Sequence, residues 1–511
     1  MDPPAILPRT SLADPAAAQG AARGVIEITS TTARGPLGTA YRRALGLLHS
    51  ATTARLDRED AEDAVLQPSL GELLSTLQQS GERELADRIL SRLLATQRAD
   101  GSWAASSARS AARETGDALR GLLEALPSRP SLEATIRRAS GWCLEPEHAR
   151  GSGSGDPTAA LAMAAALHAA GTTLEDSRLR EAAQAMEPPR SSVWRAAIRA
   201  ASTLADLSPH AHEDRLGLLL DLGRHEPVER SLADAERAQR TDGAVPAGRG
   251  ARGSCPRCMA QLVAAWYRVG KRVPADQALA YLLAHQGDSG ALPDRVESAA
   301  TPRRDSAAAT RELLDAIRWH IATAFANQVG GFEDHIRPGD GRFGFLLREA
   351  GPLAGRQVLD AGCGRGALAR ALLTAYPSTV LTAMDLSPEM LAHAPEGVTR
   401  RRGSIQSLPF EDGTFDVVYC VEALEHACNP EGAVGELCRV VRPGGRVLVV
   451  DKNAERAGAL TIEAWESWFD RKEVEGWLGK PCGEVRSTPL LHCPELGPEL
   501  FIGWRGTRSR G

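Results

Sequence analysis

The residues best suited to chemistry in this chain form a glycine-rich turn between an apolar strand and a helix. The run Val358-Leu359-Asp360-Ala361-Gly362-Cys363-Gly364-Arg365-Gly366 carries an apolar segment into an acid and then into the turn, and we expect a helix over 367–375. Glycine has no Cβ and adopts positive φ, so a ligand can lie directly against the peptide groups of such a turn. A G-x-G-x-G spacing alone indicates nucleotide binding only weakly, so its meaning depends on the residues that follow.

A second acid stands where a bound nucleoside needs one. The strand expected over 380–384 is followed by Asp385, twenty-five residues after Asp360. In a doubly wound sheet, an acid at the end of the second strand reaches the two hydroxyl groups of a ribose. Further expected strands and helices alternate with short connections, which predicts a parallel α/β sheet.

Four motifs together resemble those of the class I S-adenosylmethionine-dependent methyltransferases, close to the ubiquinone and menaquinone subgroup. They are LDAGCGRG, MDLSPEML, SLPFEDGTFDVVYCVEALEH and RVVRPGGRVLVVD, and the resemblance covers residues 326–511. The alternative is a Rossmann-like sheet that binds NAD or no ligand. An acid just before the turn suits a cationic amino-acid cofactor better than the pyrophosphate of a dinucleotide. The resemblance therefore implies a Rossmann-like methyltransferase that uses S-adenosyl-L-methionine.

The resemblance also implies which residues contact this cofactor. Asp360 is expected to favour the ammonium of the methionine moiety, and Gly362 and Gly364 are expected to let that moiety lie on the turn. Asp385 is expected to accept from the ribose hydroxyls. The loop that begins at Ser404, where many family members have Asp, is expected to meet the adenine edge. The full predicted set is Asp360, Ala361, Gly362, Cys363, Gly364, Asp385, Leu386, Met390, Ser404, Ile405, Gln406 and Cys420.

Two candidate catalytic residues, Glu425 and His426, follow the fourth expected strand of the sheet, in an expected helix. The sulfonium methyl group is already electrophilic, so the enzyme mainly aligns a nucleophile and excludes water. A base is needed only if the nucleophile carries a proton at the working pH, and histidine is easily poised near neutral pH. The alternative is that both residues only cap or orient the helix. We predict no metal site.

Aromatic residues gather after the fifth expected strand, although the whole chain is only 4% aromatic. They are Trp465, Trp468, Phe469 and Trp477. They could cover an apolar or aromatic acceptor. They could equally form the buried face of a helix over 462–469, which is the commoner case for aromatics at helical spacing.

The first 325 residues are rich in Ala, Leu and Arg, and they repeat. The run Gln97-Arg98-Ala99-Asp100-Gly101-Ser102-Trp103 has related copies that begin at Gln239 and at Gln286. The copies are 142 and 47 residues apart, which is about three periods and one period. A period in this range predicts an array of helix pairs, and six pairs fit between residues 25 and 325.

Six helical hairpins can close into an (α/α)6 toroid, and the Q-x-x-D-G-x-W form resembles the repeats of squalene-cyclase and protein-prenyltransferase toroids. The alternative is an open solenoid, which would leave apolar end faces that need caps. The D-x-D-D acid of the cyclases is absent, and no Asp, Cys and His trio for the prenyltransferase zinc is evident. Cys255 and Cys258 form one CxxC pair without a second, too few ligands for structural zinc. This region is therefore predicted to bind or assemble rather than to catalyse.

Composition narrows the remaining possibilities. A net charge of −5 and an isoelectric point of about 6.2 argue against nucleic-acid binding. A run of about twenty apolar residues, as a membrane span requires, is absent. Nine scattered cysteines and no apparent signal peptide predict a cytoplasmic protein.

The predicted fold class is thus multidomain. A disordered tail over 1–24 precedes an all-α, (α/α)6 toroid-like helical repeat domain over 25–325 and an α/β Rossmann-like class I methyltransferase domain over 326–511. The first hypothesis is methylation of a small molecule, such as a secondary metabolite, a lipid-linked intermediate or a glycan, which the toroid holds or shapes. The second is methylation of a protein- or carrier-bound substrate docked by the toroid. The third is a terpenoid-type toroid enzyme with a regulatory methyltransferase half.

Overall fold

The computed structural model describes most of the chain beyond its first 32 residues. The described residues are 33–57, 68–104, 110–145, 148, 157–186, 215–247, 251–297, 303–337, 339–460, 462–491 and 499–510. The predicted tail over 1–24 lies outside them. None of the described helices is long and apolar enough to cross a membrane.

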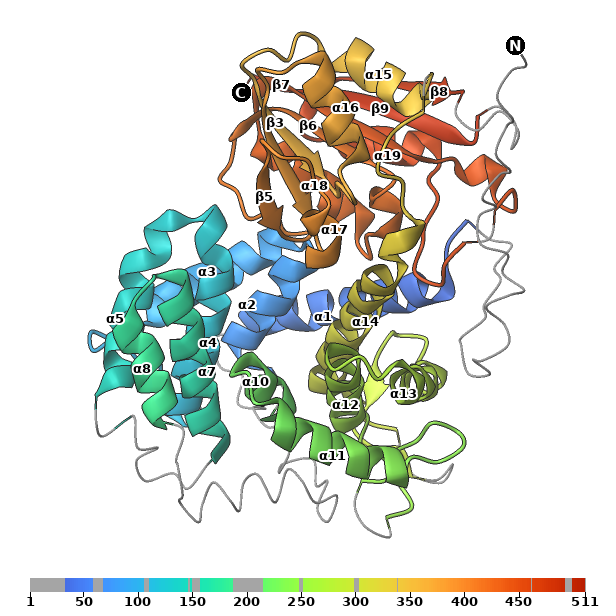
Figure 1. The fold of residues 1–511 in the computed structure, drawn as a ribbon. Helices are drawn as coiled ribbons and strands as arrows, with labels where there is room; N and C mark the ends of the chain where they lie inside the picture. The colour runs from blue at the N-terminus through green and yellow to red at the C-terminus, as the bar shows by residue number, and fades with distance from the viewer. Residues whose placement is uncertain are drawn as a thin grey trace, which may run out of the picture.

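The chain first forms a region of helices, followed by a region built on a sheet (Figure 1). The helices of the first region are α1 (Pro36–Leu56), α2 (Leu70–Gln79), α3 (Arg83–Thr96), α4 (Ala111–Ala125), α5 (Glu133–Leu144), α7 (Pro157–Thr173), α8 (Ser177–Met186), α10 (Arg215–Asp221), α11 (His225–Ala238), α12 (Pro256–Arg268), α13 (Arg272–Ala284) and α14 (Ala307–Gln328). Two short strands, β1 (Leu292–Pro293) and β2 (Asp305–Ser306), precede α14.

Local sequence signals set the starts of several of these helices. Ser69 accepts from the backbone N–H of Glu72, and the Glu72 side chain accepts from the N–H of Ser69, which is a capping box at α2. The Ser110 side chain caps α4 by accepting from the backbone N–H of Arg113, without a reciprocal bond to the Arg113 side chain. Cys255 and Cys258 lie at the start of α12, where the Cys255 sulfur accepts from the Cys258 N–H at 3.4 Å. These caps satisfy donors that the first helical turn leaves without partners.

The helices contact one another in a definite order. Helix α2 contacts α4, α4 contacts α7, α7 contacts α10, α10 contacts α12, α12 contacts α14, and α14 contacts α2 again. A second set packs against these six helices: α3, α5, α8, α11, α13 and α1 contact α2, α4, α7, α10, α12 and α14 respectively. Apolar side chains from both sets form one buried core.

The repeated motif makes the same contacts in each of its three copies. The glutamine donates through Nε2 to the carbonyl oxygen of the glycine four residues later and to a carbonyl oxygen near the start of another helix of the second set. The acceptors are Gly101 and Thr135 for Gln97 (3.1 and 3.2 Å), Gly243 and Pro274 for Gln239 (3.2 and 2.9 Å), and Gly290 and Ala40 for Gln286 (2.9 and 3.0 Å). The third copy joins α13 to α1, the last and first helices of that set in the chain.

Gly290→Ala is expected to destabilise the protein more than Gly270→Ala does. Both glycines have positive φ, +88° and +78°, so an alanine is strained at either position. A Cβ on Gly290 would lie 2.2 Å from the carbonyl oxygen of Arg43 in α1, whereas nothing lies within 4 Å of a Cβ on Gly270. We expect Gly290→Ala to cost about 2 kcal/mol more, since overpacking typically costs that much. Thermal unfolding of both variants measures the difference, and equal melting temperatures would argue against the close α13–α1 packing.

The second region is a seven-stranded sheet in the order β5-β4-β3-β6-β7-β9-β8. The strands are β3 (Gln357–Ala361), β4 (Val380–Asp385), β5 (Thr399–Arg402), β6 (Phe415–Val421), β7 (Val441–Lys452), β8 (Cys482–Leu490) and β9 (Phe501–Arg508). All neighbours are parallel except β9, which is antiparallel to both β7 and β8. The predicted parallel α/β sheet is therefore present, with an antiparallel pair at one edge.

Helices cover both faces of this sheet (Figure 1). They are α15 (Gly341–Ala350), α16 (Ala367–Ala375), α17 (Pro388–Ala392), α18 (Pro430–Val440) and α19 (Arg471–Gly479). Side chains of α15 and α16 share one apolar core with the sheet, and side chains of α18 and α19 share the other. Parallel strands buried on both faces place their carboxyl ends along one edge, where ligands of such folds bind.

Two expectations about local structure are wrong. The helix expected around Glu425 and His426 is a single 3-10 turn, Leu424–His426. The possible helix over 462–469 is absent, because that segment pairs with the start of the described chain. The Trp468 N–H donates to the Ala33 carbonyl and the Gly35 N–H to the Glu466 carbonyl, both at 2.8 Å. A backbone partner more than 400 residues away leaves no local signal in the sequence.

Candidate active site

A cavity of about 450 Å³ lies where the two regions meet. The carboxyl ends of β3 and β4, the loop after β5 and the segment after β6 line one side. Helix α14 and the ends of α2 and α4 line the other. The lining residues are Gln79, Glu124, Arg318, Trp319, Ile321, Ala322, Phe325, Phe332, Gly362, Gly364, Asp385, Leu386, Met390, Arg402, Gly403, Ser404, Ile405, Gln406, Ser407, Glu422, Ala423, His426, Ala427 and Cys428.

The cavity brings together most of the predicted cofactor residues. Eight of the twelve line it: Gly362, Gly364, Asp385, Leu386, Met390, Ser404, Ile405 and Gln406. The other four, Asp360, Ala361, Cys363 and Cys420, belong to β3, β6 and the turn itself and do not line the cavity. The sequence led us to expect the helical region to hold the acceptor, but the residues of its wall were not predicted, because nothing in the sequence of α14 indicates where that helix packs.

The glycine-rich turn is held open toward the cavity by β4. The N–H groups of Gly362 and Cys363 both donate to the Met384 carbonyl, at 2.8 and 2.9 Å. Gly362 has a φ of +84°, and a Cβ there would lie 2.4 Å from the Cβ of Ala423, so this position requires glycine. A Cβ on Gly364 would meet no atom within 4 Å, which leaves room for a ligand against its backbone.

Asp385 connects the turn to the next helix. Its Oδ2 accepts from the Gly364 N–H and its Oδ1 from the Ser387 N–H, both at 2.9 Å. Burial raises the pKa of Asp385, and these backbone hydrogen bonds oppose the shift. Each carboxylate oxygen has a second lone pair. Ribose hydroxyls on the cavity side are therefore suitable donors to it.

Asp360 lies in β3 beneath the turn and is 2% exposed. Its Oδ2 is buried and has no donor at hydrogen-bond geometry among the described residues, although the buried Tyr419 hydroxyl lies close enough to lower the pKa of this carboxyl. A poorly satisfied buried acceptor is costly, and burial, the larger effect, raises the pKa of Asp360 to about 7. A cationic ligand near the turn would favour the charged carboxylate. The chemistry of Asp360, Asp385 and the open turn therefore fits S-adenosyl-L-methionine.

The affinity for S-adenosylhomocysteine, which carries the same ammonium, is expected to rise as the pH increases through about 7. Below its raised pKa of about 7, Asp360 is protonated and neutral. Above that pH it is negative and attracts the ammonium, so binding should strengthen up to about tenfold between about pH 6 and about pH 8. Calorimetric titrations across this range measure the effect. Asp360→Asn should flatten the profile, and a flat profile in the unmodified protein would separate Asp360 from the ligand.

The loop 403–407 links the cavity to the helical region. The Ser404 hydroxyl accepts from the Gln406 N–H at 3.2 Å. The Gln406 side chain donates through Nε2 to the Gln79 carbonyl at 3.0 Å and accepts through Oε1 from the Asn429 N–H at 2.8 Å. One donor and one acceptor of this amide hold the loop against α2 and residue Asn429, and the contact expected between this loop and the adenine edge stays a prediction.

The two candidate catalytic residues have different surroundings. Glu425 is 2% exposed and does not line the cavity. The Lys452 ammonium donates to both of its carboxylate oxygens, at 2.6 and 2.5 Å. His426 does line the cavity. Its Nδ1 accepts from the indole N–H of Trp465 at 3.2 Å, so its proton belongs on Nε2, which lies 3.4 Å from Glu425 Oε1.

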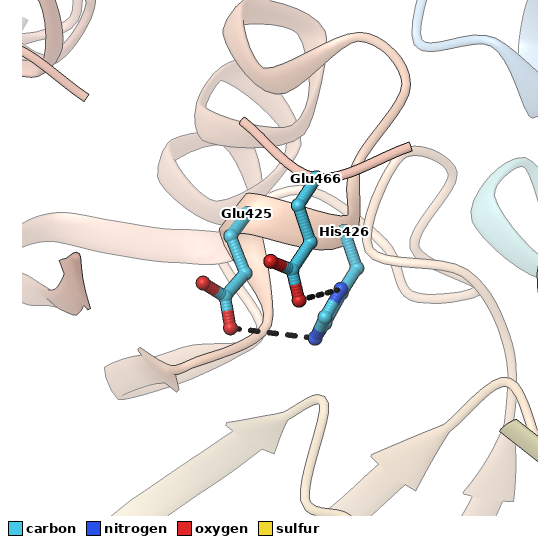
Figure 2. A group of neighbouring side chains, drawn as sticks. All are labelled: Glu425, His426 and Glu466. Carbon is cyan, nitrogen blue, oxygen red and sulfur yellow. Dashed lines mark ion pairs between the residues drawn. The ribbon is translucent and has the colours of Figure 1, made fainter. Parts of the chain in front are cut away.

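Electrostatics keep His426 neutral. Burial, with a smaller effect of Lys452, lowers the pKa of His426 to about 3. Burial also raises the pKa of Glu466 to about 8, and Glu425 adds to that shift. Figure 2 shows the imidazole of His426 facing both carboxyl groups from one side, with Nε2 toward Glu425 and Nδ1 toward Glu466, 3.7 Å from Glu466 Oε1. These three groups are close enough to hold a metal ion, but Lys452 already neutralises Glu425 and the Trp465 indole occupies Nδ1, so we assign no metal here.

Of the aromatic cluster, Trp465 lies nearest the site. Its ring packs edge-on against Phe325 of α14, with centroids 6.1 Å apart, and Phe325 packs against His426 at 4.8 Å. Trp468 and Phe469 belong to the two cores of the sheet region, and Trp477 packs on Phe469. Trp465 does not line the cavity and belongs to the core of the helical region, so it reaches the site only through His426 and Phe325. The sequence predicted the cluster but not which core each member joins.

Glu422 is a cavity residue that the sequence did not single out as a site residue. It follows β6 with a φ of +50°, an unusual conformation for a residue other than glycine. Its carboxylate is paired with Arg342, which also pairs with Asp340. Such backbone strain often occurs at functional sites.

Comparison with known proteins supports a methyl-transfer site. A family model described as a methyltransferase domain matches residues 359–449. Malonyl-[acyl-carrier protein] O-methyltransferase of Pectobacterium atrosepticum is 35% identical over 183 residues, 34% of this chain and 68% of that protein. Ubiquinone biosynthesis O-methyltransferase of Shigella boydii is 33% identical over 213 residues, 36% of this chain and 88% of that protein. A 2-methyl-6-phytyl-1,4-hydroquinone methyltransferase of Synechocystis is 36% identical over 129 residues, 24% of this chain and 40% of that protein.

Proposed function

The chain belongs to the class I S-adenosylmethionine-dependent methyltransferases and uses S-adenosyl-L-methionine as its methyl donor, and from this we propose that it methylates a small molecule held between the sheet region and the helical region. The observation that carries the proposal is the composition of the cavity. Phe325 of α14 and Gln79 of α2 line the same cavity as Gly362 and Asp385. The helical region therefore supplies a wall of the site, and a cavity of about 450 Å³, which also has to receive the donor, is of the size that small-molecule sites have.

Different residues of the chain then have different roles in methyl transfer. The bound donor supplies an electrophilic methyl group. Gly362 and Gly364 leave room for its amino-acid end, Asp385 accepts from its ribose, and Ser404 lies in the loop expected at its adenine. Phe325 and the neighbouring residues of α14 cover the cavity, exclude water and hold the acceptor in line, which is the main contribution that this reaction needs.

We further propose that the helical region is an (α/α)6 toroid of six helix pairs over 25–325, joined to a methyltransferase domain over 326–511. Two observations support the toroid. The order of helix contacts returns from α14 to α2, and the Gln286 motif joins α13 to α1. Closure would give the acceptor cavity a continuous helical wall.

A second candidate, transfer to a carrier-bound acceptor, is favoured by the similarity to the malonyl-[acyl-carrier protein] methyltransferase. One experiment separates the two. The purified protein is incubated with methyl-labelled S-adenosylmethionine and with an extract of the producing cells divided by size into small-molecule and macromolecular fractions. We expect label in the small-molecule fraction. Label confined to the macromolecular fraction would replace the first candidate with the second.

We propose that His426 acts on the acceptor in its neutral form and that Glu425 and Lys452 position it. Because Nδ1 accepts from Trp465 and Nε2 carries the proton, this imidazole can orient the acceptor by donating a hydrogen bond but cannot take its proton. His426→Ala is therefore expected to slow methyl transfer about tenfold, the effect of losing one hydrogen bond of about 1.4 kcal/mol in the transition state. Affinity for S-adenosylhomocysteine should change little, because the cofactor contacts lie elsewhere in the cavity. Single-turnover rates with the acceptor identified above, beside calorimetry, measure both quantities. An unchanged transfer rate would limit His426 to a structural role.

A further inference from the structure

A second cavity, of about 380 Å³, lies inside the helical region and adjoins the first. The six helices that contact one another in ring order all contribute to its lining. Four residues line both cavities: Gln79, Glu124, Arg318 and Trp319. We call these four residues the neck. Because the neck belongs to both cavities, its chemistry acts on any acceptor that occupies them.

The arginines around the neck are already paired with acids. Arg318 donates to Asp315 at 2.8 Å, and Arg311 donates to the other oxygen of the same carboxylate at 3.2 Å. Arg268 donates to Asp221 at 2.7 Å and lies over the ring of Trp319, 5.1 Å from its centroid. These cations therefore leave no clear site for an anionic ligand.

Glu124 is different, because no described cation pairs with it. Its Oε2 accepts from the Ser75 hydroxyl at 2.8 Å and from the Gln79 amide at 2.5 Å. Its Oε1 accepts from no group in the described residues. Glu124 is an exposed residue, so its carboxylate presents a negative charge and an open acceptor to solvent as well as to both cavities.

Gln79 holds this carboxylate in place. Its Nε2 donates to Glu124, while its Oε1 is enclosed by protein and is not accessible from the cavities. The accessible acceptor at the neck is therefore the Glu124 carboxylate. A charged acceptor matches a group that carries positive charge and several N–H donors, as a primary ammonium does.

We propose that the acceptor carries an ammonium group that binds the Glu124 carboxylate at the neck, with an apolar or aromatic part against Trp319 and Phe325. This inference rests on the proposed function, because it names the class of acceptor for the same site. Charge-assisted hydrogen bonds are roughly twice as strong as neutral ones. The neck should therefore distinguish an amine from an alcohol of the same shape.

The test uses the full-length protein saturated with S-adenosylhomocysteine and three probes of similar size: 2-phenylethylamine, 2-phenylethanol and phenylacetate. Calorimetry of each probe should show the amine binding about tenfold tighter than the alcohol, and the carboxylate weakest. Glu124→Gln should bring the amine and the alcohol within about twofold. Glu181→Gln, which changes an exposed glutamate of α8 outside both cavities, is the matched control and should keep the preference.

The outcomes separate this inference from the proposed function. If S-adenosylhomocysteine itself fails to bind, the proposed function falls. If it binds and the amine shows no preference, binds more weakly than phenylacetate or does not bind at all, only the ammonium site is overturned. A preference for the amine that survives Glu124→Gln, in a variant with an unchanged melting temperature, also overturns it.

Discussion

Asp385→Ala is expected to weaken the binding of S-adenosylhomocysteine about a hundredfold or more while the protein stays folded. The variant removes the carboxylate that the ribose hydroxyls are expected to contact, and two hydrogen bonds to a charged group are worth about 3 kcal/mol or more together. It also frees the Gly364 and Ser387 N–H groups that the carboxylate holds. Burial disfavours the charged form of Asp385 and raises its pKa. Removing the carboxylate therefore also removes a desolvation cost, which offsets part of the stability lost with these two hydrogen bonds.

The control for this variant is Asp451→Ala. Asp451 is also a buried aspartate in the last residues of a strand, and it also accepts from two backbone N–H groups, those of Glu425 and Lys452. It does not line the cavity. Calorimetry should therefore show near-normal affinity for Asp451→Ala and an intermediate loss for Asp385→Asn. Equal affinities in Asp385→Ala and the unmodified protein would move the ribose site elsewhere.

Trp465→Ala is expected to cost about 3–5 kcal/mol of stability, the usual range for a buried tryptophan. Trp465 is 3% exposed, and its ring meets His320 and Phe325 of the helical region across the boundary between the two regions. Its indole N–H also donates a hydrogen bond to Nδ1 of His426. The variant therefore removes packing between the regions and a fixed orientation of the imidazole together. Thermal unfolding measures the first effect, and single-turnover methyl transfer measures the second.

Two further variants divide these effects. Trp465→Phe keeps most of the packing and removes only the N–H donor, so it should retain most of the stability and alter transfer alone. Trp477→Ala removes a half-buried tryptophan that packs on Phe469 within the sheet region, and it should cost less than Trp465→Ala. If the Trp477 and Trp465 alanine variants were equally stable, Trp465 would not be a contact of special importance between the regions.

Most residues that the sequence predicted to contact the cofactor line one cavity, because they follow one another along the chain; their contact with the cofactor stays a prediction. Gly362 and Gly364 lie in the turn after β3 and Asp385 is the last residue of β4, so their spacing alone predicts that they meet at one edge of the sheet. The helical side could not be predicted in this way. Phe325 and Glu124 lie in ordinary amphipathic helices, and only packing between distant segments brings them to the cavity.

Backbone pairing between distant segments explains the clearest error. The segment around Trp465 has aromatic residues at helical spacing, yet its backbone pairs with residues 33–37 instead of with itself. The repeated glutamines show the opposite case. Their spacing predicted helix pairs, and the contacts of Gln97, Gln239 and Gln286 give the repeat a physical cause, since each amide joins a turn to another helix.

The most direct test of a shared site is hydrogen–deuterium exchange of the full-length protein with and without S-adenosylhomocysteine. Filling one cavity lined by both regions should slow exchange in the loop 403–407 and the turn 362–364, and also in residues 318–325 of α14 and at the end of α2. The hydrogen bond from Gln406 to the Gln79 carbonyl provides a direct link between the two sides. Protection confined to residues 359–449, with exchange in α2 and α14 unchanged, would contradict a methyl-transfer site formed by both regions.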